Sequence, residues 1–188
     1  LTGKAGSGKT TFLRNLRSES SKRMIVLAPT GIAAMNADGV TIHSFFQLPF
    51  APFVPESSFS AGSSANYSFK FSKEKIAIMR SLDLLVIDEI SMVRADLLDA
   101  VDMVLRKYRD RRKPFGGVQL LLIGDLQQLA PVVKDDDSEL LSRFYDYLYF
   151  FGSRALQQTR YVTVELKKVY RQNTVSYTHL TLPTTERV

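Results

Sequence analysis

The sequence predicts an α/β domain in which a parallel sheet is sandwiched by helices. Short, almost continuously apolar runs recur along the chain, and such runs are typical of strands buried on both faces of a parallel sheet. Segments with apolar residues at helical spacing lie between them. Polar or glycine-containing sequences directly follow three of the runs, where α/β sheets place their ligand sites.

The individual elements follow from these patterns. The predicted strands are residues 24–28, 84–87, 118–123 and 161–166, and the predicted helices are residues 11–16, 31–36 and 95–106. In the last helix, leucines and valines at three- and four-residue spacing form one apolar stripe. Residues 47–67 first alternate Phe and Pro and then become rich in Ser, Gly and Ala, so we expect an exposed insertion or partly ordered loop there.

The segment Gly3-Lys4-Ala5-Gly6-Ser7-Gly8-Lys9-Thr10 fits the pattern G-x-x-x-x-G-K-[ST]. Glycines in this pattern let the backbone turn so that successive N–H groups point at phosphate oxygens, and the following helix adds its positive end. Lys9 would reach the β- and γ-phosphates, and Thr10 would ligate Mg²⁺. A glycine-rich turn with an exposed lysine is the alternative. The candidate nucleotide-binding residues are Gly3, Gly6, Ser7, Gly8, Lys9, Thr10 and Thr11.

Only Leu1 and Thr2 precede this loop, although a P-loop normally follows a buried strand. We therefore expect the first strand, which is the central strand of the sheet, to be truncated.

Two adjacent acids, Asp88 and Glu89, follow the apolar run 84–87. At the end of a strand, neighbouring side chains point in different directions, so the two acids can have different functions. Asp88 suits the shell of Mg²⁺, and Glu89 suits a general base that polarises the attacking water. A pair of surface acids is the alternative.

The next strand leads into Gly124-Asp125-Leu126-Gln127-Gln128-Leu129-Ala130-Pro131-Val132. A neutral amide near the γ-phosphate can detect it by hydrogen bonding without adding charge. Gln128 is our choice for this sensor and Gln127 is the second choice. The alternative is a polar turn closed by Pro131.

Composition excludes some classes of site. The chain has 188 residues and no cysteine, which excludes disulfides, thiolate metal sites and a cysteine nucleophile. No apolar run reaches the 18 residues needed to span a bilayer, so we expect no membrane partner. We also expect an intracellular protein, cytoplasmic if bacterial, and the lack of cysteine is compatible with a reducing interior. The formal charge of +6 suits a polyanionic partner. The densest basic stretch, residues 106–113, is expected on a solvated face near a helix C-terminus.

The ordered set of motifs at residues 3–10, 28–34, 41–46, 87–92 and 124–132 resembles superfamily 1 DNA helicases. Within them, the chain is most similar to the petite-integration-frequency (PIF) family, relatives of the RecD-like helicases. The segment Val169-Tyr170-Arg171-Gln172 resembles the family's next motif, at the entry to a second RecA-like domain. The resemblance implies a RecA-like P-loop NTPase domain, with ATP and Mg²⁺ bound.

The resemblance also implies roles for individual residues. Lys9, Thr10, Asp88, Glu89 and Gln128 match the ATPase core, with Thr10 and Asp88 at the metal and Lys9, Glu89 and Gln128 in catalysis. Arg171 matches the arginine finger, for which a surface arginine is the alternative. The residues that match the lining of single-stranded DNA are Thr30, Gly31, His43, Ser44 and Phe45. Without the resemblance, we would interpret His43 as a hydrogen-bonded histidine of the core or of a loop, and Phe45 and Phe46 as residues of the hydrophobic core.

We expect three segments along the chain. Residues 1–165 form the first RecA-like domain, truncated at its start, and residues 166–174 lead to a second RecA-like domain that is missing. Residues 175–188 resemble the translation of an adapter used in sequencing libraries, and we expect them to be a non-native tail. A Thr-rich loop is the alternative for this tail.

The function implied is that of an ATP-dependent DNA helicase fragment. Its parent would bind single-stranded and forked DNA, move in the 5′→3′ direction, and serve DNA repair, recombination or telomere maintenance. This polypeptide alone would show little or no unwinding, because stepping needs two such domains. Two rivals stay open: a P-loop ATPase that acts on a partner other than nucleic acid, and a domain that only binds nucleotide or DNA.

Overall fold

A computed structural model describes residues 1–54 and 70–170 of the chain. Four parallel strands form a sheet in the order β3-β2-β4-β5, and two more strands, β1 and β6, pair with each other in parallel. The strands are β1 Thr2–Gly3, β2 Met24–Ala28, β3 Val40–Thr41, β4 Leu84–Ile87, β5 Gln119–Leu122 and β6 Glu165–Leu166. The described helices are α1 Lys9–Glu19, α2 Gly31–Asn36, α3 Ile42–Phe46, α4 Lys73–Ser81, α5 Ala95–Tyr108, α6 Asp135–Ser142 and α7 Arg154–Gln157, with the 3₁₀ turns η2 Ile90–Met92, η3 Pro114–Gly117 and η4 Phe150–Gly152.

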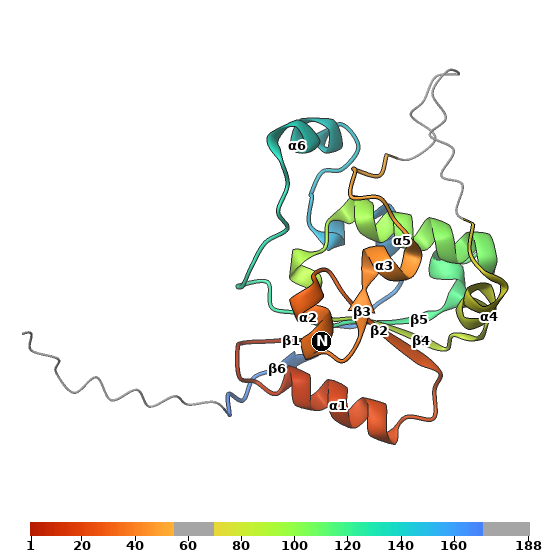
Figure 1. Cartoon of the computed structure of the whole chain (residues 1–188). Helices are drawn as coiled ribbons and strands as arrows, with labels where there is room; N and C mark the ends of the chain where they lie inside the picture. The colour runs from red at the N-terminus through yellow and green to blue at the C-terminus, as the bar shows by residue number, and fades with distance from the viewer. Residues whose placement is uncertain (55–69, 171–188) are drawn as a thin grey trace, which may run out of the picture.

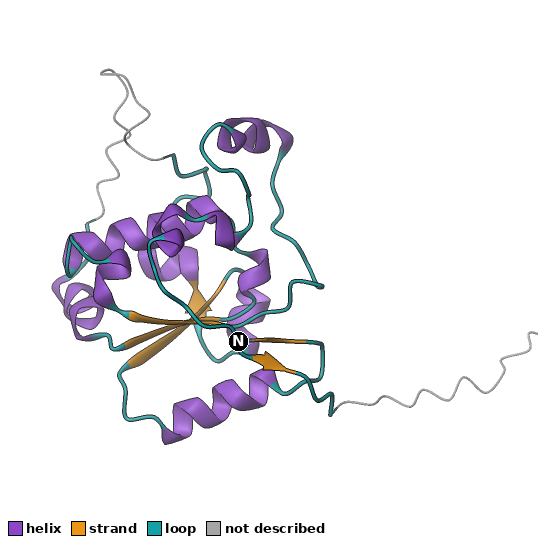
Figure 2. Cartoon of the chain, turned by 180° about the vertical axis from the view of Figure 1, so that it is seen from behind, coloured by secondary structure: helices purple, strands orange, loops and turns teal. Residues whose placement is uncertain are grey.

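Helices cover both faces of the sheet (Figure 1). Helix α1 lies on one face and α3 and α5 lie on the other, and the view from behind shows the same three layers (Figure 2). Alternate strand residues explain this arrangement, because successive side chains point to opposite faces. Val26, Leu84 and Val86 pack with Leu13 of α1, whereas Leu27, Leu85 and Ile87 belong to the cluster that contains the buried face of α5. The strands are therefore buried on both sides, as their apolar runs predict.

The first strand is expected to be truncated, and the strand that leads into the P-loop is indeed short. Two residues, Thr2 and Gly3, form β1, and Thr2 also makes a parallel bridge to Gly124 just past β5. The Leu1 ammonium group donates to the Leu122 carbonyl, 2.8 Å away. Strand β1 therefore lies between β5 and β6 and extends the sheet towards β6.

Most other elements match their predictions. The strands at 24–28 and 84–87 and the helix at 31–36 have the expected bounds, and the strand expected at 118–123 forms over Gln119–Leu122. The helices expected at 11–16 and 95–106 are longer than predicted. The strand expected at 161–166 is wrong for its first part, because only Glu165 and Leu166 pair with β1.

The prediction of an exposed segment at 47–67 is wrong for three of its described residues. Leu48, Phe53 and Val54 are buried, and the Phe53 N–H donates to Asp96 of α5 at 2.9 Å. Residues 55–67 lie outside the described part of the chain. Burial of three apolar side chains anchors the start of this segment to the core, which local composition does not reveal.

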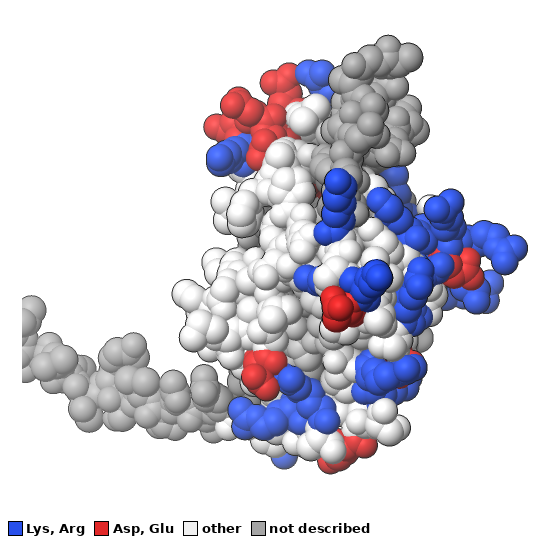
Figure 3. Space-filling view, turned by 45° about the vertical axis from the view of Figure 1, so that its right-hand side comes forward, with Lys and Arg blue, Asp and Glu red and all other residues white. Residues whose placement is uncertain are grey.

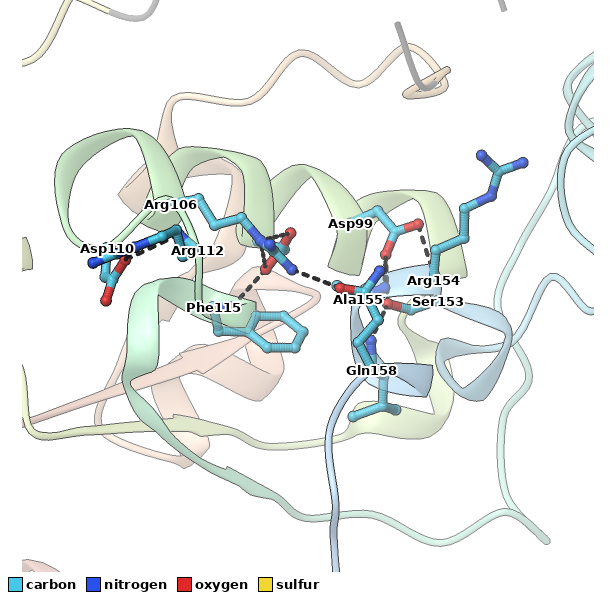
Figure 4. Close-up of polar contacts among 11 residues, drawn as sticks. Asp99, Arg106, Asp110, Arg112, Phe115, Ser153, Arg154, Ala155 and Gln158 are labelled. Atoms are coloured by element: carbon cyan, nitrogen blue, oxygen red, sulfur yellow. Dashed lines mark hydrogen bonds and ion pairs between the residues drawn. The ribbon is translucent and has the colours of Figure 1, made fainter. Parts of the chain in front are cut away.

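Helix α5 carries three buried carboxylates, Asp96, Asp99 and Asp102, at three-residue steps along one side. Each accepts hydrogen bonds from a different distant segment, and Figure 4 shows this for Asp99. Asp99 accepts bonds from Ser153 and Ala155, whereas the Phe115 N–H donates to Asp102. The helix therefore holds the loops of one face of the domain through charge-assisted hydrogen bonds as well as through its apolar stripe.

The basic stretch 106–113 is only partly on a solvated face, so this expectation needs correction. Arg106 pairs with Asp102 at 2.8 Å. Arg109 donates at 2.7 Å to the carbonyls of Met79 and Arg80, at the end of α4. Both arginines therefore bind fixed acceptors. Arg109 supplies donors that the C-terminal carbonyls of α4 need. Arg112, whose side chain is 94% exposed, fits the original expectation.

None of the helices in the described part of the chain combines the length and apolar character that crossing a bilayer requires.

Candidate nucleotide and nucleic-acid site

The P-loop links β1 to α1 and has a backbone that only glycine adopts without strain at Gly8. Gly8 has a φ of 95° and is the N-cap of α1, with no side-chain cap. The first N–H groups of a helix have no acceptor within it, and here they open towards the loop. A Cβ on Gly3 would lie 2.4 Å from the Ser7 Oγ and 2.9 Å from the Leu166 carbonyl oxygen. The loop thus depends on glycine for both its turn and its close packing.

Ser7 provides a test of whether the loop fits a phosphate. Its hydroxyl is buried and has no hydrogen-bond partner within residues 1–54 and 70–170. A buried hydroxyl without a partner costs about 1–3 kcal/mol. A phosphate oxygen in the loop would supply the missing acceptor, so the residues present fit a nucleoside triphosphate.

Lys9 folds across the loop. Its Nζ donates to the Gly3 carbonyl at 2.5 Å and to the Lys4 carbonyl at 3.3 Å. The same ammonium group lies close enough to Asp88 and Glu89 to favour their charged forms and oppose the rise in their pKa values. The P-loop lysine and the two acids therefore lie near one another, as the sequence predicts.

Asp88 and Glu89 occupy a sharp turn at the end of β4. The Glu89 backbone has a φ of 51°, in the left-handed region, and its N–H donates to the Asp88 Oδ1 at 3.0 Å. Burial raises the pKa of Asp88. Burial also raises the pKa of Glu89, and the charge of Asp88 adds to this rise. A raised pKa makes a carboxylate a better proton acceptor, which suits the general-base role expected for Glu89.

Asp125 is a residue of this site that sequence reasoning did not single out. It is buried just past the end of β5, where its Oδ2 accepts a bond from the Gln128 Nε2 at 2.8 Å and its Oδ1 accepts one from the Gln127 N–H at 3.0 Å. The bond from Gln128 lowers the pKa of Asp125, and the Lys9 charge contributes. Of the two candidate sensors, Gln128 is the one whose side-chain amide is held by Asp125. The acid directly after the strand was the available signal.

Thr30 and His43 lie at neighbouring strand ends. Strands β2 and β3 pair with Ala28 opposite Thr41, and Thr30 and His43 each follow two residues later. Thr30 is the N-cap of α2, which begins at Gly31, and its Oγ1 accepts the Ala33 N–H at 3.2 Å. Capping uses only an acceptor position of this hydroxyl, so its O–H group can still donate to a phosphate. Ser44 is exposed beside His43.

The role expected for Phe45 needs correction. Its ring is 8% exposed and packs edge-on against Phe46 in the core, with the Lys75 ammonium over it. A ring in this position cannot offer a face to a nucleic-acid base. The predicted aromatic platform is therefore not Phe45, because the helix α3 directs this side chain inwards.

Arg171, the proposed arginine finger, lies outside the described residues, as does the expected tail 175–188. The residue before it, Tyr170, donates its backbone N–H to the Gly6 carbonyl at 2.9 Å. The described part of the Val169–Gln172 motif thus contacts the P-loop.

Comparison with solved structures identifies the fold. A crystal structure of Bacteroides Pif1 bound to single-stranded DNA superposes with a TM-score of 0.82 at 50% identity, over 91% of this chain and 38% of that one. A crystal structure of Candida albicans Pif1 helicase has a TM-score of 0.69 at 35% identity, over 91% and 36% of the two chains. The expected RecA-like fold is confirmed by these neighbours.

Curated relatives agree. The ATP-dependent DNA helicase PIF1 of Candida albicans is 38% identical over 180 residues, which are 91% of this chain and 19% of the relative. The human ATP-dependent DNA helicase PIF1 is 34% identical over 92% of this chain and 24% of its own length. The chain thus spans about a fifth to a quarter of these relatives. Residues 1–185 match the family described as PIF1-like helicase, and the chain belongs to this family.

Proposed function

We propose that this chain is the ATP-binding part of a DNA helicase, in which ATP hydrolysis drives movement along single-stranded DNA and the unwinding of duplex. The observation that carries the proposal is the meeting of Lys9, Asp88 and Glu89 beside a P-loop whose Ser7 hydroxyl is buried without a partner in the described part of the chain. The relatives named ATP-dependent DNA helicases support it. So does a Bacteroides Pif1 structure in complex with ADP-AlF4.

Each described residue has a part in this chemistry. The N–H groups at the start of α1 and the Lys9 ammonium would bind the phosphates, with Lys9 leaving the carbonyls that it now contacts. Thr10 and Asp88 would hold Mg²⁺. This ion, when bound, supplies positive charge to the β- and γ-phosphates. The described part of the chain has no cluster of three His, Cys, Asp or Glu side chains that could hold a metal by themselves.

Glu89 would orient the attacking water and accept its proton, and Gln128, held by Asp125, would contact the γ-phosphate. Arg171 would complete the site when a second RecA-like domain closes over it. Because stepping along DNA needs that second domain, we propose that these 188 residues alone do not unwind duplex.

The DNA-binding edge would be formed by Thr30, Gly31, His43 and Ser44, at the tips of β2 and β3. Hydroxyls and backbone amides bind phosphates without reading sequence. Lys and Arg side chains gather along one side of the molecule, whereas acidic side chains cluster at the end that carries α6 (Figure 3). We further propose forked DNA as a substrate, 5′→3′ movement and an intracellular location, and membership of the PIF1-like helicase family supports these proposals.

The test is hydrolysis by the full-length protein that contains this chain. Glu89→Gln should lower phosphate release with single-stranded DNA by about 10²–10⁴-fold while ATP binding persists, because the amide cannot accept the proton. Glu139→Gln, an exposed acid on α6, is the matched control and should leave the rate unchanged. Equal turnover of wild type and Glu89→Gln would show that the base is another residue. A wild-type rate indifferent to single-stranded DNA would favour an ATPase that acts on another partner.

A further inference from the structure

An exposed aromatic stack stands at the tip of β3. The rings of His43 and Phe50 lie 4.7 Å apart between centroids, inclined by 24°. The Phe50 residue is 83% exposed, whereas the other phenylalanines of residues 41–54 are buried. A phenylalanine ring placed almost wholly in water gains little from folding, because burial of such a ring stabilises by about 1.5–3 kcal/mol. Its exposure leaves one face of the ring open to a ligand.

The short arch that carries Phe50 is held at both ends. At the near end, the Leu48 N–H donates to the His43 carbonyl at 3.0 Å, after Gln47 turns the chain with a φ of 51°. At the far end, the Phe53 N–H donates to the buried Asp96 carboxylate at 2.9 Å. Since Leu48 and Phe53 are buried on either side, Phe50 projects from a fixed arch.

Arg94 secures the far anchor. Its guanidinium makes two bonds of 2.8 Å to the Asp96 carboxylate, so the carboxylate that holds the Phe53 N–H is itself fixed in orientation. The side chain of Asp96 is 1% exposed. Bidentate pairs of this kind restrict geometry as well as contributing energy. The arch is therefore positioned by the core rather than by solvent.

The surroundings of the stack suit single-stranded nucleic acid. Thr30 and Ser44 place hydroxyl groups at the same edge of the sheet. The Lys75 ammonium, which donates to the Ser44 carbonyl at 3.3 Å, adds a positive charge there. A stacking ring beside phosphate-binding groups and a cation is the combination that binds single strands without sequence preference.

We propose that Phe50, supported from behind by His43, is the residue on which a base of single-stranded DNA stacks. This inference rests on the proposed function, and it assigns the aromatic platform to a residue that the motif pattern does not include. The base lies on the outer face of the Phe50 ring, while neighbouring phosphates of the strand contact the hydroxyls of Thr30 and Ser44. Asp96 is a positioning residue for the arch.

The first test measures binding of the full-length protein to a labelled oligothymidylate by fluorescence anisotropy. Phe50→Ala should weaken binding at least about fivefold, the lower end of the effect of one stacked base. Phe50→Tyr keeps an aromatic face and should bind as wild type does. Tyr161→Ala removes an exposed ring just before β6, at the opposite edge of the sheet, and should have no effect.

An oligomer of abasic sites with the same phosphates provides a second comparison. Wild type should prefer oligothymidylate, and Phe50→Ala should lose most of that preference, because the base contact is gone while the phosphate contacts remain. A uniform loss on both oligomers would show that Phe50 only supports the fold or contacts a phosphate, and would overturn the proposal.

A spectroscopic readout uses the absence of tryptophan from these 188 residues. In the chain itself, Phe50→Trp creates a single tryptophan whose emission should be quenched by oligothymidylate and unchanged by the abasic oligomer. Binding without quenching would overturn the stacking proposal and leave the proposed function standing. Failure of the full-length wild type to bind single-stranded DNA would overturn both. If Phe50→Ala changed only the association of the protein with another protein and not its binding to DNA, the ring would be part of a protein–protein contact, and the proposal would be wrong.

Discussion

Replacement of Asp99 by alanine should destabilise the domain strongly. Asp99 is 7% exposed on α5, and its carboxylate accepts four hydrogen bonds. Figure 4 labels three of the donor residues, Ser153, Arg154 and Ala155. The donors are the Tyr145 Oη at 3.0 Å, the Ser153 Oγ at 2.5 Å, the Arg154 N–H at 3.2 Å and the Ala155 N–H at 3.0 Å. All four come from residues 145–155, so this one side chain joins α5 to the segment that includes η4 and α7.

The magnitude follows from which donors can move. The two hydroxyls can rotate towards other acceptors, but the N–H groups of Arg154 and Ala155 are fixed by the start of α7. Each backbone donor left buried without an acceptor costs about 1–3 kcal/mol. The free energy of unfolding should therefore fall by about 2–6 kcal/mol, and the lower half of this range is expected because the Arg154 N–H is only partly buried. A loss near the middle of this range corresponds to a decrease in Tm of roughly 8–16 °C for a domain of this size.

Urea unfolding followed by far-UV circular dichroism measures this loss. Asp99→Asn keeps one acceptor oxygen and should lose less than Asp99→Ala. Asp38→Asn is the matched control, because its carboxylate is 93% exposed in an ion pair with Arg17, and such pairs contribute about 0–1 kcal/mol. If Asp99→Ala lost less than about 1 kcal/mol with an unchanged m-value, the carboxylate would not be the anchor of this segment.

Two further predictions concern stability. Arg109→Lys keeps the charge but loses the fork that donates to the ends of α4 and η3, so the free energy of unfolding should fall by about 1–3 kcal/mol, whereas the exposed Arg112→Ala should change nothing measurable by urea unfolding. Burial, with a contribution from Arg94, lowers the pKa of His43 below its ordinary 6.5. The unfolded chain then binds the proton more readily, so the free energy of unfolding should fall as the pH drops through about 6.5 and below. His43→Gln should reduce this dependence on pH in urea midpoints measured between about pH 7.5 and 5.5. An unchanged dependence in the variant would show that another group causes it.

Much of the site follows from local sequence. The P-loop glycines, the acids after 84–87 and the polar turn after β5 can be located because each depends on its own neighbours and on the strand before it. Parallel strands bring their carboxyl ends to one edge, so their order in the chain suffices to predict that Lys9, Asp88 and Glu89 meet. The roles of these residues in catalysis stay predictions, as does that of Arg171.

Other features depend on contacts between distant residues. Local pattern could not tell that Phe45 is buried and Phe50 exposed, since both stand in the same apolar stretch and only packing against α5 separates them. From the sequence alone, the acids of α5 resemble solvent-exposed helix residues, because the backbone N–H groups that donate to them come from segments far along the chain. Likewise, Asp125 gains its place in the site only when the distant Lys9 comes close enough for its charge to help lower the Asp125 pKa.

The sequence by itself therefore determined the type of domain, the position of most of its strands and the position of its nucleotide motif, because apolar periodicity and turn residues act over a few neighbours. Only the tertiary structure decided which polar groups are buried and paired, and which aromatic ring faces solvent. Those outcomes depend on how segments that are remote in sequence pack together. Such packing decides which side chains are buried, which remain exposed, and which buried polar groups gain hydrogen-bond partners.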